Sequence, residues 1–472
     1  MSSLPMRPAL RLIAAILAGK AAALASRAFG RGGGTTLPGV VARRIEPVTL
    51  ARLCALLPQG VPLVAGTNGK TTTTRMVAAA LAAADRRVLH NRAGANLVSG
   101  LTATALAGSG IDGRPRADIG LFETDEAALP QVIAETAPRL VLLHNLFRDQ
   151  LDRYGEIDTI AANWRAALAT LGAGATVLLN ADDPAVAMLG EGLTARVRYY
   201  GIDDLRHAAG GGEHIADAQF CRACGTRYQY LARFYAHVGH YRCPGCGRER
   251  PTPHYRLARI EPAGIGGARL LLGLPDGGME MQLPLPGLYN AANALAAVAT
   301  ARELDTPAGA IRQALEGFSA AFGRIERIDA AGRPLLVALI KNPVGASETV
   351  RMLVEASSAA AGLHMLVVIN DRHADGTDVS WLWDAEFERL AGVTGRVVVS
   401  GTRAADMAVR LKYAGIDPAR MTVVEALPAA LDTALAQLPP GAMFCALPTY
   451  TAMLELRTEL VRRGWARPFW ED

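Results

Sequence analysis

The chain has 472 residues, half of them hydrophobic, and a formal net charge of +5 at pH 7. Its length corresponds to about three domains, and its hydrophobic content is sufficient to give each of them a core. The small charge, with basic residues scattered along the chain, argues against nucleic acid as the main partner.

Residues 1–50 are the first predicted unit, with a mostly apolar helix at residues 10–24 and a glycine-rich loop at residues 30–39. The apolar run is too short and too charged to span a bilayer, because Arg11 and Lys20 interrupt it. No clear cleavage site of a secretory signal follows it. Packing of the helix on the protein is the favoured interpretation, and contact with a membrane surface is the alternative.

The most informative stretch is residues 61–74, Val-Pro-Leu-Val-Ala-Gly-Thr-Asn-Gly-Lys-Thr-Thr-Thr-Thr. It predicts a strand, a glycine loop and a helix, which together attract phosphate through backbone N–H groups, the helix N-terminus and the lysine. The hydroxyl after the lysine is suited to bind Mg²⁺. An ordinary glycine turn is the alternative. The predicted nucleotide-binding residues are Thr67, Asn68, Gly69, Lys70, Thr71 and Thr72.

The central domain is expected at residues 51–320. From about residue 51 to residue 190 apolar strands alternate with helices, which predicts an α/β fold with a parallel sheet covered on both faces. Strands are expected at residues 61–65, 87–90, 117–123, 139–145 and 176–180, and again at 256–260, 268–272 and 280–283. Ligands of such sheets bind where the strands end. Glu123 ends one strand and is a candidate Mg²⁺ ligand; a charge at a helix N-terminus is the alternative.

Four of the six cysteines form two C-x-x-C pairs, 18 residues apart, in an insert at residues 215–252. This spacing matches a closed four-thiolate zinc site that would keep the insert folded; disulfide pairing is the alternative. Cys54 and Cys445 stand in apolar contexts and are expected to be buried, and His237 and His240 are expected to pack rather than bind metal. The predicted zinc ligands are Cys221, Cys224, Cys243 and Cys246.

A second α/β domain is expected at residues 325–472, after a linker at residues 318–327. Its strands are expected near residues 335–339, 365–369, 396–399, 421–424 and 443–446. Arg324 lies in the linker, where an arginine can reach a nucleotide phosphate when two domains close. An ordinary surface arginine is the alternative.

Together these motifs resemble the Mur ligase superfamily, ATP-dependent enzymes that form amide bonds through an acyl phosphate. The motifs are Gly66-Thr-Asn-Gly-Lys-Thr-Thr72, Glu123, Asn180-Ala-Asp-Asp-Pro184, Leu285-Pro-Gly-Leu-Tyr-Asn-Ala-Ala-Asn293 and Gly323-Arg-Ile-Glu326. The resemblance implies a central domain that binds ATP and Mg²⁺. It also implies that Asn290 and Asn293 contact the adenine.

The chain departs from the amino-acid-adding members of that superfamily. They carry a histidine that helps bind a second Mg²⁺ where this chain has Gln150, and a carbamylated lysine near the position of Arg165. They also begin with a whole UDP-substrate domain, whereas only about 60 residues precede this phosphate loop. The resemblance therefore leaves open whether a second Mg²⁺ binds.

These departures and the cysteine insert are similar to one branch, the MurT synthetase subunits of lipid II isoglutaminyl synthase, as are Lys341-Asn-Pro343 and residues 370–384. That resemblance implies ATP-dependent amidation of D-glutamate in lipid II, in the cytoplasm at the inner face of the membrane. Ammonia would come from a GatD-like glutamine amidotransferase subunit in a heterodimer. The branch also supplies an aspartate to the partner's glutaminase site, for which Asp378 is preferred here over Asp375 and Asp384.

Two rival functions remain. The first is a ligase of the Mur or folylpolyglutamate type that joins an amino acid to a carboxylate. The second is a nucleotide-binding zinc module that acts as a scaffold, against which the clustered Lys70, Thr71 and Glu123 argue.

Overall fold

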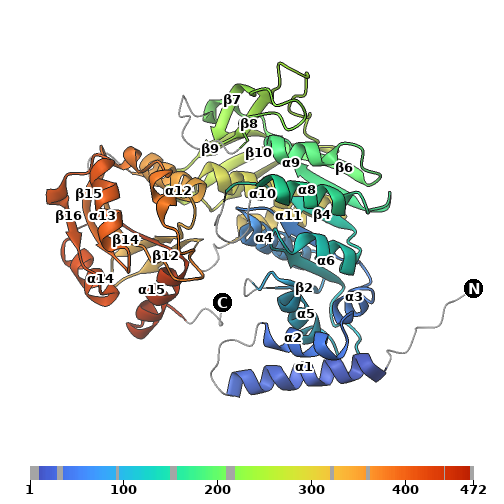
Figure 1. Ribbon diagram of the computed structural model, residues 1–472. Coiled ribbons are helices and arrows are strands. Elements are labelled where there is room, and N and C mark those ends of the chain that lie inside the picture. The colour runs from blue at the N-terminus through green and yellow to red at the C-terminus, as the bar shows by residue number, and fades with distance from the viewer. Residues whose placement is uncertain are drawn as a thin grey trace, which may run out of the picture.

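The computed structural model describes residues 10–28, 36–91, 95–148, 157–208, 218–318, 324–357, 362–440 and 442–467. Of residues 27, 28, 324 and 443 it describes the backbone alone. Two α/β units stand side by side, each built around its own sheet, and a small hairpin lies at the upper edge of the larger unit (Figure 1). The segment with Gln150 and most of the glycine-rich loop lie outside the described residues.

The larger sheet has nine strands in the order β11-β10-β9-β6-β5-β4-β1-β3-β2. The strands from β2 across to β9 pair in parallel, whereas β10 is antiparallel to both β9 and β11. The predicted parallel α/β sheet is confirmed. Its strands are β1 Pro62–Ala65, β2 Val88–His90, β3 Ile119–Glu123, β4 Leu140–Leu143, β5 Thr176–Asn180, β6 Arg196–Ile202, β9 Tyr255–Pro262, β10 Ala268–Leu274 and β11 Gly277–Leu283.

Helices cover both faces of this sheet because successive strand side chains point to opposite sides. Val64 of β1 packs in a core with α4, α10 and α11, whereas Leu63 and Ala65 pack in a second core with α1, α3, α5, α6 and α8. The helices of this unit are α1 Leu10–Ala28, α2 Leu37–Ile45, α3 Thr49–Cys54, α4 Lys70–Ala82, α5 Val98–Ala107, α6 Leu129–Thr136, α8 Ile157–Leu168, α9 Pro184–Ala187, α10 Leu288–Glu303 and α11 Ala308–Glu316.

The smaller sheet has six strands in the order β12-β13-β17-β14-β15-β16, parallel except for the β12–β13 pair. Helices α12 and α13 cover one face, and α14 and α15 cover the other. The strands are β12 Arg324–Asp329, β13 Pro334–Ala338, β14 Leu363–Val368, β15 Thr394–Ser400, β16 Met421–Val423 and β17 Met443–Pro448. The helices are α12 Pro343–Ala356, α13 Ala404–Tyr413, α14 Leu427–Ala436 and α15 Tyr450–Arg462.

Some expectations about single elements are wrong. Helix α10 begins at Leu288, so Asn290 lies in its first helical turn. Residues 324–327, expected as linker, are part of β12, because they pair with β13. Strand β6 was not expected. The buried positions of Cys54 and Cys445 are confirmed, while the domain boundaries stay predictions.

Candidate functional site

The phosphate loop, residues 66–69, connects β1 to α4 at the carboxyl edge of the sheet. Gly66 and Gly69 have φ angles of 134° and 91°, which side chains with a Cβ rarely adopt. A Cβ on Gly69 would lie 2.3 Å from Oδ1 of Asn293 on α10. The glycine therefore permits the close approach of α10, and the loop and Asn293, predicted from separate motifs, lie together.

Lys70 is buried, and its ammonium group has three oxygen partners within the protein. Its Nζ donates to the carbonyl oxygens of Gly66 (2.5 Å) and Thr67 (3.3 Å) and forms an ion pair with Oε1 of Glu126 at 2.9 Å. Glu126 is itself buried. An anion that binds the loop would compete with Glu126 for this cation. Glu126 was not predicted from the sequence, because it is one of three acids in the run Glu-Thr-Asp-Glu that begins at the last residue of β3, and no spacing distinguishes it.

A buried histidine lies behind the loop. Burial, and secondarily the charge of Lys70, lower the pKa of His144 to about 3. The ring is therefore neutral near pH 7 and adds no charge beside Lys70. Its Nδ1 lies 3.1 Å from the hydroxyl of Tyr200.

Hydrogen bonds to the segment after β4 hold the loop backbone in place. The hydroxyl of Thr67 accepts from the Phe147 N–H and donates to the Phe147 carbonyl. The Asn145 side chain accepts from the Asn68 N–H at 2.8 Å and donates to the Asn68 carbonyl at 3.2 Å. The loop therefore keeps its shape through contacts within the protein.

One contact joins the loop to the smaller unit. Asn342 caps the N-terminus of α12 by accepting from the Gly345 N–H, and its Nδ2 donates to Oδ1 of Asn68 at 3.0 Å. The N-terminus of α12 therefore meets the phosphate loop. Sequence analysis quoted Asn342 within a motif but predicted no role for it.

Most of the remaining residues that were predicted to bind nucleotide lie near the loop. Glu123 is buried at the end of β3, paired in register with Val64 of β1. Thr71 and Thr72 lie in the first turn of α4. Asn290 is buried one turn before Asn293 and donates to the Pro286 carbonyl. The side chain of Arg324 lies outside the described atoms.

The four cysteines of the insert form one cluster, in which all four sulfur atoms lie within 4.8 Å of one another. Two Sγ–Sγ distances are 3.6 Å (Cys221 to Cys246) and 3.4 Å (Cys224 to Cys243). A tetrahedral site with Zn–S bonds of about 2.3 Å has sulfur atoms about 3.8 Å apart, so the cluster fits such an ion. Hydrogen bonds from the backbone and side chain of Arg248 lower the pKa of Cys246 to about 6, which favours the thiolate.

Strands β7 (Gln229–Tyr235) and β8 (Val238–Arg242) form the hairpin between the two cysteine pairs. The His237 ring at its tip is fully buried, lies 3.2 Å from Oδ2 of Asp183 and packs on the Phe147 ring with centroids 4.7 Å apart. His240 contacts the Ile202 carbonyl. Both histidines therefore pack as predicted, and the tip supports Phe147, which in turn holds Thr67.

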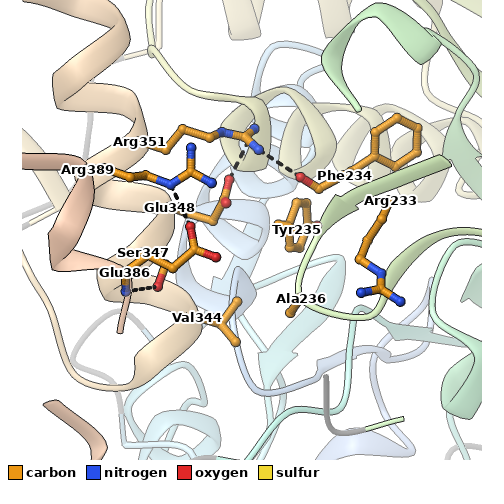
Figure 2. Close-up of a pocket in the computed structure, with 10 residues that line it drawn as sticks. All are labelled: Arg233, Phe234, Tyr235, Ala236, Val344, Ser347, Glu348, Arg351, Glu386 and Arg389. Atoms are coloured by element: carbon orange, nitrogen blue, oxygen red, sulfur yellow. Dashed lines mark hydrogen bonds and ion pairs between the residues drawn. The ribbon is translucent and has the colours of Figure 1, made fainter. Parts of the chain in front are cut away.

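The same hairpin also meets α12. Arg351 donates to the Phe234 carbonyl at 2.7 Å and lies 3.3 Å from the buried carboxylate of Glu348, beside a pocket of about 30 Å³ (Figure 2). Arg389 pairs with Glu386 on the side of this pocket away from the hairpin. The hairpin therefore contacts both Phe147, which holds the phosphate loop, and α12 of the smaller unit.

The three candidate aspartates occupy different environments. Asp375 is buried and accepts from the N–H and the hydroxyl of Thr451, which ties it to the start of α15. Asp378 and Asp384 are exposed. The N–H of Ser380 donates to Asp378 and lowers the pKa of its carboxyl. Asp375 thus has a structural role, and Asp378 is an ionised carboxylate accessible to another subunit.

Comparison with known proteins identifies the family. Residues 64–223 match the Mur ligase middle domain, and residues 339–453 match the MurT ligase C-terminal family. Subunit MurT of lipid II isoglutaminyl synthase (glutamine-hydrolyzing) from Streptococcus pneumoniae is 34% identical over 96% of this chain and 97% of its own length. The chain belongs to the MurT family. The MurT subunit of Staphylococcus aureus strain N315 is 32% identical over 95% of this chain and 97% of its own.

Solved structures support the fold of this MurT family member. A pseudomurein peptide ligase type C from Methanothermus fervidus superposes with a TM-score of 0.65 at 20% identity, covering 85% of this chain and 78% of that one. A folylpolyglutamate synthase from Mycobacterium tuberculosis superposes with a TM-score of 0.59 at 17% identity, covering 89% and 96%. At these identities the likeness establishes the Mur ligase fold.

Proposed function

We propose that the chain is the synthetase subunit of a lipid II isoglutaminyl synthase. It would amidate the α-carboxyl of D-glutamate in the lipid II stem peptide to D-isoglutamine, with ATP as energy source and glutamine as amide donor. The observation that carries the proposal is the similarity over 96% of the chain to a MurT subunit named for this enzyme. The phosphate loop supplies the chemical basis.

The residues around the loop suit activation of a carboxylate by ATP. A carboxylate oxygen attacks the γ-phosphorus, ADP leaves, and an acyl phosphate forms. Lys70 would exchange Glu126 for the transferred phosphate, while Thr71 and Glu123 would hold Mg²⁺. Asn290 and Asn293 would contact the adenine, and Thr67, Asn68, Gly69 and Thr72 would line the phosphates. Arg324 would approach them from the other side.

Ammonia completes the reaction by attacking the acyl carbon, after which phosphate leaves and the amine loses a proton. Most free ammonia is ammonium near pH 7, so an attached glutaminase is an effective source of the neutral nucleophile. We propose a GatD-like partner whose catalytic histidine is oriented by Asp378. A carboxylate on the second ring nitrogen fixes the tautomer and stabilises the protonated ring. Zn²⁺ bound by the four cysteines would be structural, since four thiolates leave no open position.

Asp378→Asn tests this proposal in the complex with the glutaminase subunit. The variant should lose about 100-fold or more of glutamine-dependent amidation, because the amide carries no charge and offers the histidine the wrong partner. An ammonium salt should restore amidation, because the phosphate loop is intact. Amidation is followed by mass spectrometry of the stem peptide.

Asp384→Asn is the matched control, another exposed aspartate in the same segment, and it should behave as wild type. Loss of activity with both glutamine and ammonium would show that Asp378 is needed in the synthetase site or for folding, and not by the glutaminase. Unchanged glutamine-dependent activity would give the role to Asp384. If wild type instead joins amino acids to the carboxylate and ignores ammonia, the chain is an amino-acid ligase.

A further inference from the structure

Helix α1 lies along the outer edge of the larger unit, against α2 (Figure 1). Its inner face belongs to the core, where Leu12, Ala15 and Ile16 are at most 2% exposed. This confirms that the helix packs on the protein. No described helix is long and apolar enough to cross a membrane.

The outer face of α1 is apolar as well. Leu10, Leu17 and Leu24 are 86%, 47% and 67% exposed. The exposed residues between them are Ala14, Ala21 and one cation, Arg11. Residues seven positions apart lie on one side of a helix, so these leucines form a stripe about 21 Å long. A surface helix of a globular protein normally turns polar residues, not leucines, to the solvent. The leucine stripe (Leu10, Leu17 and Leu24) therefore marks an interaction surface.

The charge of this end of the chain indicates what covers the stripe. Residues 1–50 contain seven lysines and arginines and a single acid, Glu46, so their net charge is +6, compared with +5 for the whole chain. The positive charge of this segment is high because acids are nearly absent from it, while the basic residues themselves are spread along the whole chain. Arg11 on α1 and Arg44 on α2 are exposed. Lys20 lies on the other flank of the stripe and donates to the Ser109 carbonyl.

We propose that the leucine stripe of α1 binds an anionic phospholipid surface. The leucines would enter the acyl region while the cations around them face the phosphates, as in helices that lie in the membrane interface. A second copy of the chain would bring the same positive charge to the stripe, which disfavours self-association. The proposal rests on the proposed function in one respect, since lipid II is a lipid-linked substrate.

Sedimentation with vesicles tests the proposal on the full chain, without lipid II or ATP. Wild type should bind vesicles of equal parts phosphatidylcholine and phosphatidylglycerol about tenfold more tightly than phosphatidylcholine alone. The double variant Leu17→Ser/Leu24→Ser should bind the anionic vesicles about tenfold or more weakly, because two exposed leucines no longer enter the lipid. Added salt should weaken wild-type binding.

The matched control is Leu205→Ser/Leu231→Ser, which removes two exposed leucines from another part of the larger unit and should leave vesicle binding unchanged. Leu10→Ser, at the most exposed position of the stripe, provides a second variant if the double variant melts early. Absence of wild-type binding, or equal binding by stripe and control variants, would overturn the proposal. So would a wild-type dimer that the stripe variant converts to monomer. Ammonia-dependent amidation of a soluble stem peptide tests the proposed function separately.

Discussion

The phosphate loop and the cysteine insert are two ligand sites built by opposite means. The groups of the loop stand at the ends of β1, β3 and β4, in a nine-stranded sheet with a core on each face. The cysteines flank a two-stranded hairpin, and the cluster of buried residues around them has five members, of which two are cysteines and one, Ala187, belongs to α9. Near its tip the hairpin joins the core of the larger unit through Phe234, Tyr235 and Val238, but its base has few buried residues besides the cysteines, and two strands alone are marginally stable. The loop should therefore keep its geometry without ligand, whereas the insert depends on metal.

The two sites are nevertheless linked by contacts within the protein. The hairpin tip packs His237 on Phe147, and Phe147 holds the hydroxyl of Thr67 in the phosphate loop. On its other side the hairpin accepts a hydrogen bond from Arg351 of α12. A change in the insert is therefore expected to reach the nucleotide site through Phe147, and the smaller unit through Arg351.

Lys70→Ala removes the cation of the loop and should have the largest effect, a fall in ATP-dependent amidation of about 1,000-fold. It also removes the cation that pairs with the buried Glu126, which should cost about 3 kcal/mol of stability. The double variant Lys70→Ala/Glu126→Gln should regain that stability but no activity. Turnover and thermal melting separate the two effects, and near-normal amidation by Lys70→Ala would exclude the nucleotide assignment.

Cys221→Ser should remove a tightly held zinc ion and loosen the insert before it affects the core of the larger unit, because a closed site has no coordination position for chemistry. Elemental analysis of protein purified without added metal should find one zinc per wild-type chain, as one four-cysteine cluster predicts. Limited proteolysis should then cut the variant within residues 218–252. Cys445→Ser, a buried cysteine outside the insert, should retain the metal. Zinc-free wild type with four reactive thiols would show that the site is wrong.

Arg351→Met tests whether the hairpin is coupled to the smaller unit. The variant loses the hydrogen bond to Phe234 and leaves the buried Glu348 without its nearest cation, at a cost of about 2 kcal/mol. We expect the KM for ATP to rise severalfold with zinc content unchanged. Arg389→Met is the control, because Arg389 lines the same pocket but pairs with Glu386, three residues away. Equal effects of both variants would argue against a specific coupling.

Glu348→Gln should change the free energy of unfolding by an amount that depends on pH. Burial raises the pKa of Glu348 from 4.5 to about 7, so the folded state binds this proton more tightly than the unfolded state. Wild-type stability should therefore fall as the pH rises from about 4.5 to about 7, and the variant should lack that fall. Near pH 8 the variant should be more stable by about 3 kcal/mol, and near pH 4.5 about equal. Urea unfolding at both values measures this; identical pH profiles would show that Glu348 is not responsible.

Much of this molecule follows from short spacings in the sequence. The glycine loop, Lys70 and the hydroxyls after it lie within a few residues, so the strand–loop–helix geometry that brings them together is local. The two cysteine pairs are likewise defined by their spacing, and the cluster at the hairpin base matches the prediction. The alternation of apolar strands with helices predicts the parallel sheet, because each strand buried on both faces must be apolar throughout.

Tertiary structure alone decided which distant residues meet. Glu126 reaches Lys70 across 56 positions and Asn342 reaches Asn68 across 274, and neither spacing has a local signature. The three aspartates at 375, 378 and 384 look alike in sequence, yet packing against α15 buries Asp375 and leaves Asp378 exposed. Such pairings depend on how whole elements pack. Local patterns set the element and its buried face, whereas the partner of a polar side chain is whatever the packed neighbour places within hydrogen-bond distance.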